Sequence, residues 1–232
     1  MSYKTLGIMG GMGPAATVCF FDEVVRHTVA GCDQEHLDIV ITNHSTLPDR
    51  TEAIRNGDPL GLCGQLQEDA RKLERMGAQL IAMPCNTGHL WIGQIRDAVE
   101  IPVIDMIRET LKVCADKGDG HVGVLATAGT VESDLYGIAA RELGLEVRYP
   151  SPVCQAGVTA VIYDEVKGGR AVPKGVFEGA VEEMVAAGCT SVALACTELS
   201  VYAHRHEVSD VCVDALDVLV RASIEAAGAT YR

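Results

Sequence analysis

One segment occurs twice in this chain, and each copy ends in a cysteine. The first copy reads GAQLIAMPC and runs from Gly77 to Cys85, and the second reads GCTSVALAC and runs from Gly188 to Cys196. In both copies the glycine stands eight residues before the cysteine, and the residues between them are mostly apolar. A helix that ends at glycine and a short buried strand after it produce this spacing. Each copy therefore predicts a strand whose carboxyl end carries a thiol.

A second pair of segments lies upstream in the same order. Residues Gly7–Gly13 read GIMGGMG and residues Gly123–Gly129 read GVLATAG, so each is a short apolar strand that runs into a loop of small residues. Strands and helices alternate along both halves, which favours parallel sheets. We predict an α/β protein of two pseudo-symmetric lobes, each a mainly parallel sheet flanked by helices. The active site is expected in the cleft between the lobes, with one thiol from each.

The periodicity of apolar residues places the individual elements. Strands are expected at 3–9, 37–42, 101–104, 122–126, 191–195 and 211–213, and a further one leads into Cys85. Helices are expected at 14–29, 64–76, 90–99, 106–117, 132–143, 156–167, 177–187 and 215–227. The segments 44–51 and 127–130 are expected as loops.

Composition limits the classes of partner. The net charge of −13 argues against binding to nucleic acid or to an anionic membrane, because both need a basic surface. No run of about 18 apolar residues is present, and the apolar amino terminus is broken by glycines and a proline, so we expect neither a membrane span nor a signal peptide. The nine cysteines form no CxxC pair and no zinc-type spacing. They predict reduced thiols in the cytoplasm and no metal site.

The two thiols suit the exchange of a proton on a carbon acid. A thiolate can remove an α-hydrogen if its pKa lies near the working pH, and amides at the start of a following helix are expected to favour the thiolate at both cysteines. Short hydroxyl and amide side chains near the two cysteines can donate to carboxylate oxygens, where negative charge builds up. These are Asn86, Thr87, Thr127, Thr130 and Thr197. The alternative is a pair of core cysteines that happen to end strands.

The loop after the first strand permits a second interpretation. Residues 11–16 fit the pattern G-x-G-x-x-A of dinucleotide-binding proteins, in the strand-to-helix position that this pattern needs. The pattern also needs an acidic residue at the end of the second strand, whereas this strand ends in Asn43 and His44. A tight turn that lets a small substrate approach the backbone is therefore favoured over nucleotide binding.

Two basic residues are candidates for binding an anionic substrate. Arg50 lies in the polar loop after the second strand, where open α/β sheets bind ligands, and its guanidinium can clamp a carboxylate with two parallel hydrogen bonds. A solvated arginine in a surface turn is equally compatible with the local pattern. Lys167 precedes Gly168 and Gly169 and, on local pattern alone, is a solvated residue at the end of a helix.

Five motifs of the chain resemble those of the aspartate/glutamate racemase superfamily, and in combination they are most similar to the cofactor-independent aspartate racemases. The motifs are GGMGP, PDRT, MPCNTGH, LATAGT and ACTEL, and the likeness covers nearly the whole chain. One departure is Gly88, where the family usually has alanine. The resemblance implies two lobes, of residues 1–105 plus 212–232 and of residues 106–211. It also implies that neither pyridoxal phosphate nor any other cofactor or metal is needed, and that the enzyme is commonly a homodimer.

The resemblance also assigns roles to single residues. It implies that Cys85 and Cys196 are the two acid/base residues and that Arg50 and Lys167 bind the substrate carboxylates. His89 follows the family pattern, although a residue that only packs a helix is an equal alternative. The full set expected to contact substrate is Met12, Asp49, Arg50, Thr51, Asn86, Thr87, Thr127, Thr130, Lys167, Thr197 and Glu198.

The resulting hypothesis is a cofactor-independent isomerase that interconverts L- and D-aspartate by two-base proton transfer. A glutamate racemase or a broad-specificity amino-acid racemase is the nearest alternative. A decarboxylase or isomerase of related fold is more remote, because a decarboxylase of this type needs only one cysteine. The last alternative is a non-catalytic protein that binds a small ligand.

Overall fold

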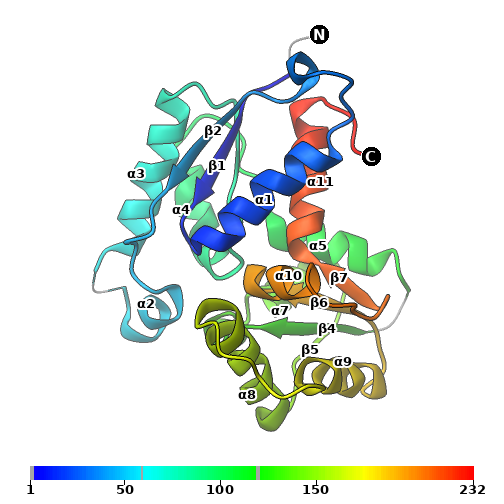
Figure 1. The fold of residues 1–232 in the computed structure, drawn as a ribbon. Coiled ribbons are helices and arrows are strands. Elements are labelled where there is room, and N and C mark those ends of the chain that lie inside the picture. The colour runs from blue at the N-terminus through cyan, green and yellow to red at the C-terminus, as the bar shows by residue number, and fades with distance from the viewer. Residues whose placement is uncertain (1–2, 59, 119–120) are drawn as a thin grey trace. The chain divides into compact units, whose positions relative to one another are not determined.

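The computed structural model describes residues 3–58, 60–118 and 121–232 (Figure 1). The chain divides into two compact units, which we call unit 1 (Met1–Met106 with Leu216–Arg232) and unit 2 (Ile107–Ala215). Each unit holds one sheet. Within the described ranges, no helix combines the length and the apolar composition that crossing a membrane requires.

Unit 1 is built on a parallel sheet of three strands in the order β2-β1-β3. The strands are β1 (Leu6–Gly10), β2 (Ile39–Asn43) and β3 (Leu80–Ala82). Its helices are α1 (Pro14–His27), α2 (Arg50–Asn56), α3 (Leu62–Arg75), α4 (Ile92–Arg96) and, apart from its first residue, α11 (Ala215–Ala227), with 3-10 turns at Asp33–Glu35 and Thr87–Trp91.

Unit 2 is built on a parallel sheet of four strands in the order β5-β4-β6-β7. The strands are β4 (His121–Ala126), β5 (Val147–Arg148), β6 (Cys189–Ala195) and β7 (Cys212–Asp214). Its helices are α5 (Met106–Ala115, whose first residue belongs to unit 1), α6 (Ala128–Glu132), α7 (Leu135–Glu142), α8 (Pro152–Ala160), α9 (Val176–Ala186) and α10 (Thr197–Ala203), and a π-helix (Val161–Lys167) continues α8.

The first three strands of each unit are arranged in the same order, and the sheet of unit 2 adds β7 beside β6. In each unit the first strand is central, the second pairs on one side of it and the third on the other, and all pairings are parallel. Thus β1, β2 and β3 correspond to β4, β5 and β6. The expected fold class, two mainly parallel sheets flanked by helices, is confirmed.

The matched glycines have matched structural roles. Gly77 and Gly188 follow helices α3 and α9 with φ angles of 94° and 86°, in the left-handed region that favours glycine. Each donates its amide to a carbonyl in the last turn of its helix, at 2.9 Å, to Glu74 and Val185 respectively. This is the helix end that glycine supplies, and it occurs at the same distance before each of the two cysteines.

Gly7 and Gly123 allow the central strand of each unit to pack closely on the end of the corresponding helix, α3 in unit 1 and α9 in unit 2. A Cβ on Gly7 would lie 2.8 Å from the Cβ of Ala78, and a Cβ on Gly123 would lie 2.9 Å from the Cβ of Met184. Since real Cβ atoms do not approach so closely, only glycine allows this packing of β1 on the end of α3 and of β4 on α9.

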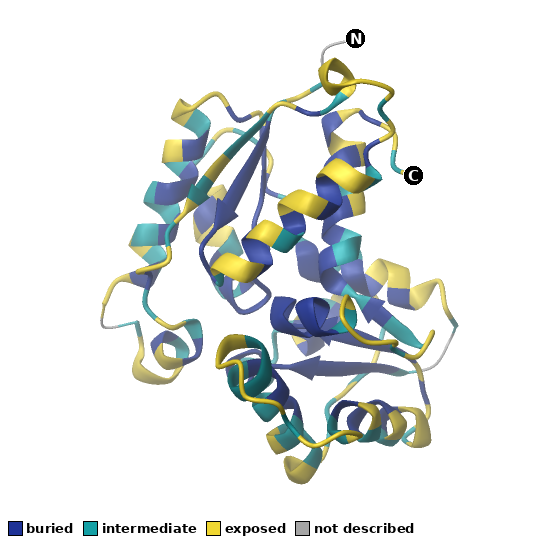
Figure 2. Ribbon diagram, in the orientation of Figure 1, coloured by how far each residue is buried: buried dark blue, intermediate teal, exposed yellow. Residues whose placement is uncertain are grey.

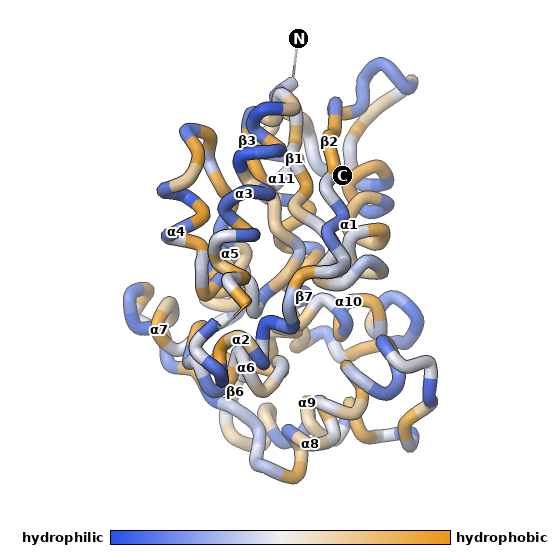
Figure 3. The backbone as a smooth tube through the Cα atoms, turned by 90° about the vertical axis from the view of Figure 1, so that its left-hand side faces the viewer, coloured by the Kyte–Doolittle hydropathy of each residue, from blue (hydrophilic) through white to orange (hydrophobic). Residues whose placement is uncertain are grey.

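Each unit has its own apolar core around the central strand. Figure 2 shows β1 and β4 as buried strands. Hydrophobic and hydrophilic residues both occur along the helices (Figure 3), and the buried residues of α1, α3 and α9 recur at the spacing of one helix face. Fully or nearly fully buried core residues include Met9, Leu66, Leu73, Ile81 and Met83 in unit 1 and Leu125, Phe177, Met184, Val192 and Leu194 in unit 2.

Four expectations about local structure were wrong. The segment 101–104 contributes only an isolated bridge between Ile81 and Val103, not a strand. The segments 44–51 and 127–130 contain the starts of α2 and α6, two helices too short to show a clear apolar period. In addition, β7 pairs with β6, so residues 212–214 lie in unit 2 and the return to unit 1 begins at Leu216.

Candidate active site

In unit 1 the loop after β1, the segment after β2 and Cys85 come from one edge of the sheet. The register pairs Gly10 with Asn43 and Ile8 with Ala82, so the carboxyl ends of the three parallel strands lie together. This edge is where open α/β sheets bind their ligands.

The loop that carries Cys85 is fixed by His89. Cys85 is 5% exposed, its amide donates to the carbonyl of Met83 at 2.8 Å, and its own carbonyl lies 2.8 Å from Nδ1 of His89. The Nε2 of His89 accepts the amide of Met106 at 3.1 Å, so the ring proton is on Nδ1 and is donated to Cys85. Burial lowers the pKa of His89 below its ordinary value, although Asp105 opposes this effect. A neutral His89 therefore joins the cysteine loop to the start of α5.

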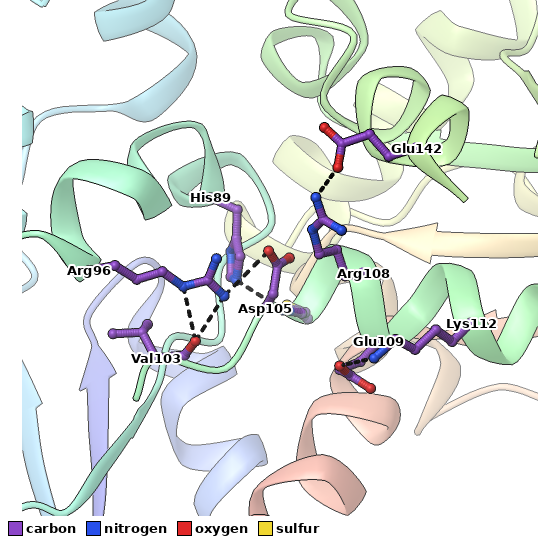
Figure 4. Close-up of polar contacts among 9 residues, drawn as sticks. His89, Arg96, Val103, Asp105, Arg108, Glu109, Lys112 and Glu142 are labelled. Atoms are coloured by element: carbon purple, nitrogen blue, oxygen red, sulfur yellow. Dashed lines mark hydrogen bonds and ion pairs between the residues drawn. The ribbon is translucent and has the colours of Figure 1, made fainter. Parts of the chain in front are cut away.

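Figure 4 shows how the segment before α5 is held. Arg96 donates to the carbonyl of Val103 through Nε and Nη2, at 3.3 and 3.0 Å, and its Nη2 lies 3.5 Å from the carboxylate of Asp105. These contacts position the backbone that presents the Met106 amide to His89. The interpretation of His89 as a packing residue is the one that these contacts support.

The other substrate-contact candidates of unit 1 come from the same loops. Those with buried side chains are Met12, Thr51, Asn86 and Thr87. The carboxylate of Asp49 accepts the amide of Glu52 at 3.0 Å and thereby caps α2, which is an ordinary role for aspartate before a helix. Arg50 is half-buried at the first position of α2, and its Nη1 donates to the carbonyl of Pro48 at 3.1 Å.

A pair that the sequence did not suggest lies beside the glycine loop. Nδ1 of His44, the residue after β2, is 2.7 Å from a carboxylate oxygen of Asp69, which is buried and also accepts Lys72 at 3.0 Å. The His44 amide donates to the carbonyl of Gly10 at 3.2 Å, and a Cβ on Gly11 would lie 2.5 Å from the His44 backbone. The one available signal was an acidic residue on the apolar face of α3, between Leu66 and Ala70.

In unit 2 the site residues again follow paired strand ends. Ala126 of β4 pairs with Ala195 of β6, so Thr127 and Cys196 leave the sheet side by side. The hydroxyl of Thr127 caps α6 by accepting the amide of Thr130 at 3.4 Å, and the two threonine hydroxyls lie 3.2 Å apart. Both hydroxyls are buried at the sheet edge.

Cys196 lies in a chain of charged contacts. Its thiol donates to Oε2 of Glu198 at 2.9 Å, and Oε1 of the same carboxylate lies 2.6 Å from Nζ of Lys167. Cys196 and Glu198 are 5% and 7% exposed, and Thr197 between them is buried. Lys167 comes from the last position of the π-helix, a wide helical turn that is often found at functional sites. Unit 2 thus brings three of the predicted site residues into direct contact.

The expectation of a stabilised thiolate at Cys196 was wrong. Burial, followed by the charge and the hydrogen bond of Glu198, raises the pKa of the Cys196 thiol well above its ordinary value, and only a backbone hydrogen bond and Lys167 oppose this. The carboxylate outweighs the amides at the start of the helix because it is a full charge in direct contact. This thiol is therefore held protonated.

Comparisons with known proteins point to one family. The model of the family described as Asp/Glu/hydantoin racemase matches residues 9–223. The chain is 31% identical over 146 residues to a broad specificity amino-acid racemase of Bacillus subtilis, covering 61% of this chain and 63% of that protein. It is 29% identical over 129 residues to a glutamate racemase of Corynebacterium diphtheriae, covering 54% and 47%. The matched region thus spans less than two thirds of either relative.

Solved structures cover the chain more fully. An aspartate racemase of Picrophilus torridus superposes with a TM-score of 0.83 and 28% identity, covering 99% of this chain and 96% of that one. An aspartate racemase homologue of Pyrococcus horikoshii superposes with a TM-score of 0.78 and 26% identity, covering 97% and 99%. These findings confirm the resemblance carried by the five motifs, and the chain belongs to the Asp/Glu/hydantoin racemase family.

Proposed function

We propose that this protein is a cofactor-independent isomerase that interconverts L- and D-aspartate with Cys85 and Cys196 as its two acid/base residues. The observation that carries the proposal is the equivalent placement of the two thiols. One follows β3 and the other follows β6, which are corresponding strands in the three-strand order that the two sheets share. Two related halves that each supply one thiol suit a reaction in which a proton is removed from one face of a carbon and another proton is added to the opposite face.

In the proposed reaction, one cysteine as thiolate removes the α-proton and becomes a thiol. The other cysteine donates its own proton to the opposite face of the carbanion and becomes a thiolate. The positive charges of Arg50 and Lys167 bind the two carboxylates of the substrate, which suits a dicarboxylic amino acid. The short donors near each thiol stabilise the carboxylate on which charge develops. These donors are Asn86, Thr87, Thr127, Thr130 and Thr197.

The structural similarity to two proteins named as an aspartate racemase and an aspartate racemase homologue favours aspartate as the substrate. The similarity to a broad specificity racemase and to a glutamate racemase makes wider or longer substrates the alternative. The experiment incubates the purified protein with single L-amino acids in D2O without added cofactor. We expect α-deuterated L- and D-aspartate in equal final amounts.

Each other outcome identifies a competing function. Deuteration of glutamate or of many amino acids supports the alternative substrates, and loss of carbon dioxide supports a decarboxylase. Unchanged aspartate, with neither deuterium nor D-enantiomer, contradicts the proposal. The control variant Cys63→Ala replaces a cysteine of α3 outside the proposed site and should leave the result unchanged.

We further propose a cytoplasmic homodimer. All nine cysteines lie in the described ranges and none of them forms a disulfide there, which suits a reducing compartment. Helix α1 exposes Val18, Phe21 and Val25 by 68%, 41% and 38%, at spacings that place them on one face. A second copy that packs on this stripe would cover it. Light scattering of the wild type and of Phe21→Glu tests the assignment, and a monomeric wild type contradicts it.

A further inference from the structure

We propose that Glu198 is the residue that keeps Cys196 protonated in the substrate-free protein, so that Cys196 begins as the proton donor for the enantiomer whose α-proton Cys85 removes. The inference deepens the proposed function, on which it rests, by giving the two cysteines different starting states. Glu198 is then a positioning residue, because it acts on the reaction through Cys196 and does not touch the reacting carbon.

The first argument is that both carboxylate oxygens of Glu198 are already engaged. Oε2 accepts the thiol of Cys196 at 2.9 Å, and Oε1 is 2.6 Å from the ammonium of Lys167. A carboxylate is also a poor ligand for an anionic substrate, because like charges repel. Both facts indicate that Glu198 is the hydrogen-bond partner of Cys196 and not the substrate contact that the ACTEL motif suggested.

The second argument concerns the direction of the proton. An ionised carboxylate only accepts hydrogen bonds, so its contact with Cys196 exists only while the sulfur carries a proton. A thiolate there would face the carboxylate charge across 2.9 Å in a nearly buried position. The ammonium of Lys167 lies 2.6 Å from Oε1 of the same carboxylate, so a positive charge is paired with Glu198 while Oε2 accepts the thiol. Among the described residues, the charged groups that act on this thiol are Glu198 from α10 and Lys167 from the π-helix.

The third argument is that the same ion pair connects Cys196 to the arrival of substrate. Lys167 is the proposed ligand of a substrate carboxylate, and its side chain is 31% exposed whereas that of Glu198 is 9% exposed. A bound carboxylate would share the ammonium with Glu198. Cys196 would then already carry the proton that it donates when the substrate binds.

The test measures the reactivity of Cys196 without any substrate. Wild type, Glu198→Gln and Lys167→Met are alkylated with iodoacetamide from pH 6 to 10, and the modified peptides are counted by mass spectrometry. Glu198→Gln keeps the shape of the side chain but removes its charge, so Cys196 should react about 3- to 10-fold faster near pH 7.5. Lys167→Met removes the opposing charge, so Cys196 should react more slowly than in the wild type.

Two controls make the comparison specific. Glu182→Gln removes an exposed carboxylate from α9 and should leave Cys196 unchanged. Cys114, a buried thiol of α5 in the same unit, is the internal reference for general loosening of the fold, because its rate should not change. A Glu198→Gln rate that is equal to or below the wild-type rate, after this correction, overturns the proposal.

Two further readouts keep the test decisive if a variant folds poorly. In the wild type alone, alkylation of Cys196 should still be rising above pH 8.5, the pKa of a free cysteine, and a plateau below it overturns the proposal. If Glu198→Gln is active, its kcat/KM should begin to fall at a lower pH than that of the wild type, because Cys196 then loses its proton at a lower pH. Failure of the deuteration experiment with these alkylation results intact would contradict the proposed function and not the role of Glu198.

Discussion

Replacing Gly7 by alanine should destabilise unit 1, because the new Cβ has no room. It would lie 2.8 Å from the Cβ of Ala78, 3.2 Å from the carbonyl oxygen of Leu80 and 3.4 Å from the Cβ of Leu73. Carbon atoms pack best at about 3.5–4.0 Å, so β1 must move away from the end of α3 by roughly 0.7 Å or more. None of the three atoms is the far end of a flexible side chain, so the strand pairing itself must yield.

The expected cost is about 1–3 kcal/mol of unfolding free energy, the usual range for overpacking a core. Thermal denaturation followed by circular dichroism should show a fall of about 2–4 °C for each kcal/mol in a chain of this size. Gly64→Ala is the matched control, because among the described residues no atom other than those of its chain neighbours and of its own helix backbone lies within 4 Å of the new Cβ. Gly64 is exposed in α3, so this substitution should raise the unfolding free energy by about 0.5–1 kcal/mol. Wild-type stability of Gly7→Ala, or a larger loss in Gly64→Ala, would refute the packing argument.

Three further predictions concern the site. Cys85→Ala and Cys196→Ala should each abolish racemisation while circular dichroism stays native, although the remaining thiol can still exchange deuterium on one face; near-normal racemisation in either variant contradicts the two-base mechanism. Arg50→Ala and Lys167→Ala should each lower kcat/KM for aspartate by about 10- to 1000-fold, since a charge-assisted contact contributes about 1.5–3 kcal/mol or more when buried, and unchanged kinetics in both would place these cations outside the site. Burial lowers the pKa of His89, so below about pH 6.5 the unfolded chain binds a proton that the folded chain does not. Urea denaturation should therefore show the unfolding free energy falling as the pH drops below about 6.5, and falling less in His89→Gln. Equal dependence of the unfolding free energy on pH in the two proteins would contradict the neutral His89.

The features that the sequence predicted are local ones. The caps at Gly77 and Gly188 depend on the left-handed backbone of a single residue, and the strands after them are short apolar runs, so both can be recognised in a stretch of ten residues. The parallel arrangement of the sheets followed from the alternation of strands and helices. The boundary at 212 was misplaced because a strand of three residues does not show in its own sequence which sheet it joins.

The features that the sequence missed depend on contacts between particular side chains, which the pattern of apolar residues does not show. Asp69 stands 25 positions from His44, and the local sequence shows only an acidic residue on the apolar face of α3, without indicating its partner. The charge state expected for Cys196 was wrong because it was argued from the helix start alone, whereas the side chain of Glu198, two positions on, folds back onto the sulfur. On local pattern Lys167 was interpreted as a solvated residue, whereas its ammonium pairs with Glu198, which lies in a different helix.

The separation of the two sulfurs tests the central proposal most directly. If Cys85 and Cys196 serve opposite faces of one carbon, each sulfur must come within roughly 3–4 Å of that carbon in the closed site. A crystal structure of the protein with bound aspartate should therefore show the two sulfurs on the order of 7–9 Å apart, with the α-carbon between them. Sulfurs more than about 15 Å apart in that complex, or an α-carbon that contacts only one of them, would contradict the two-base mechanism.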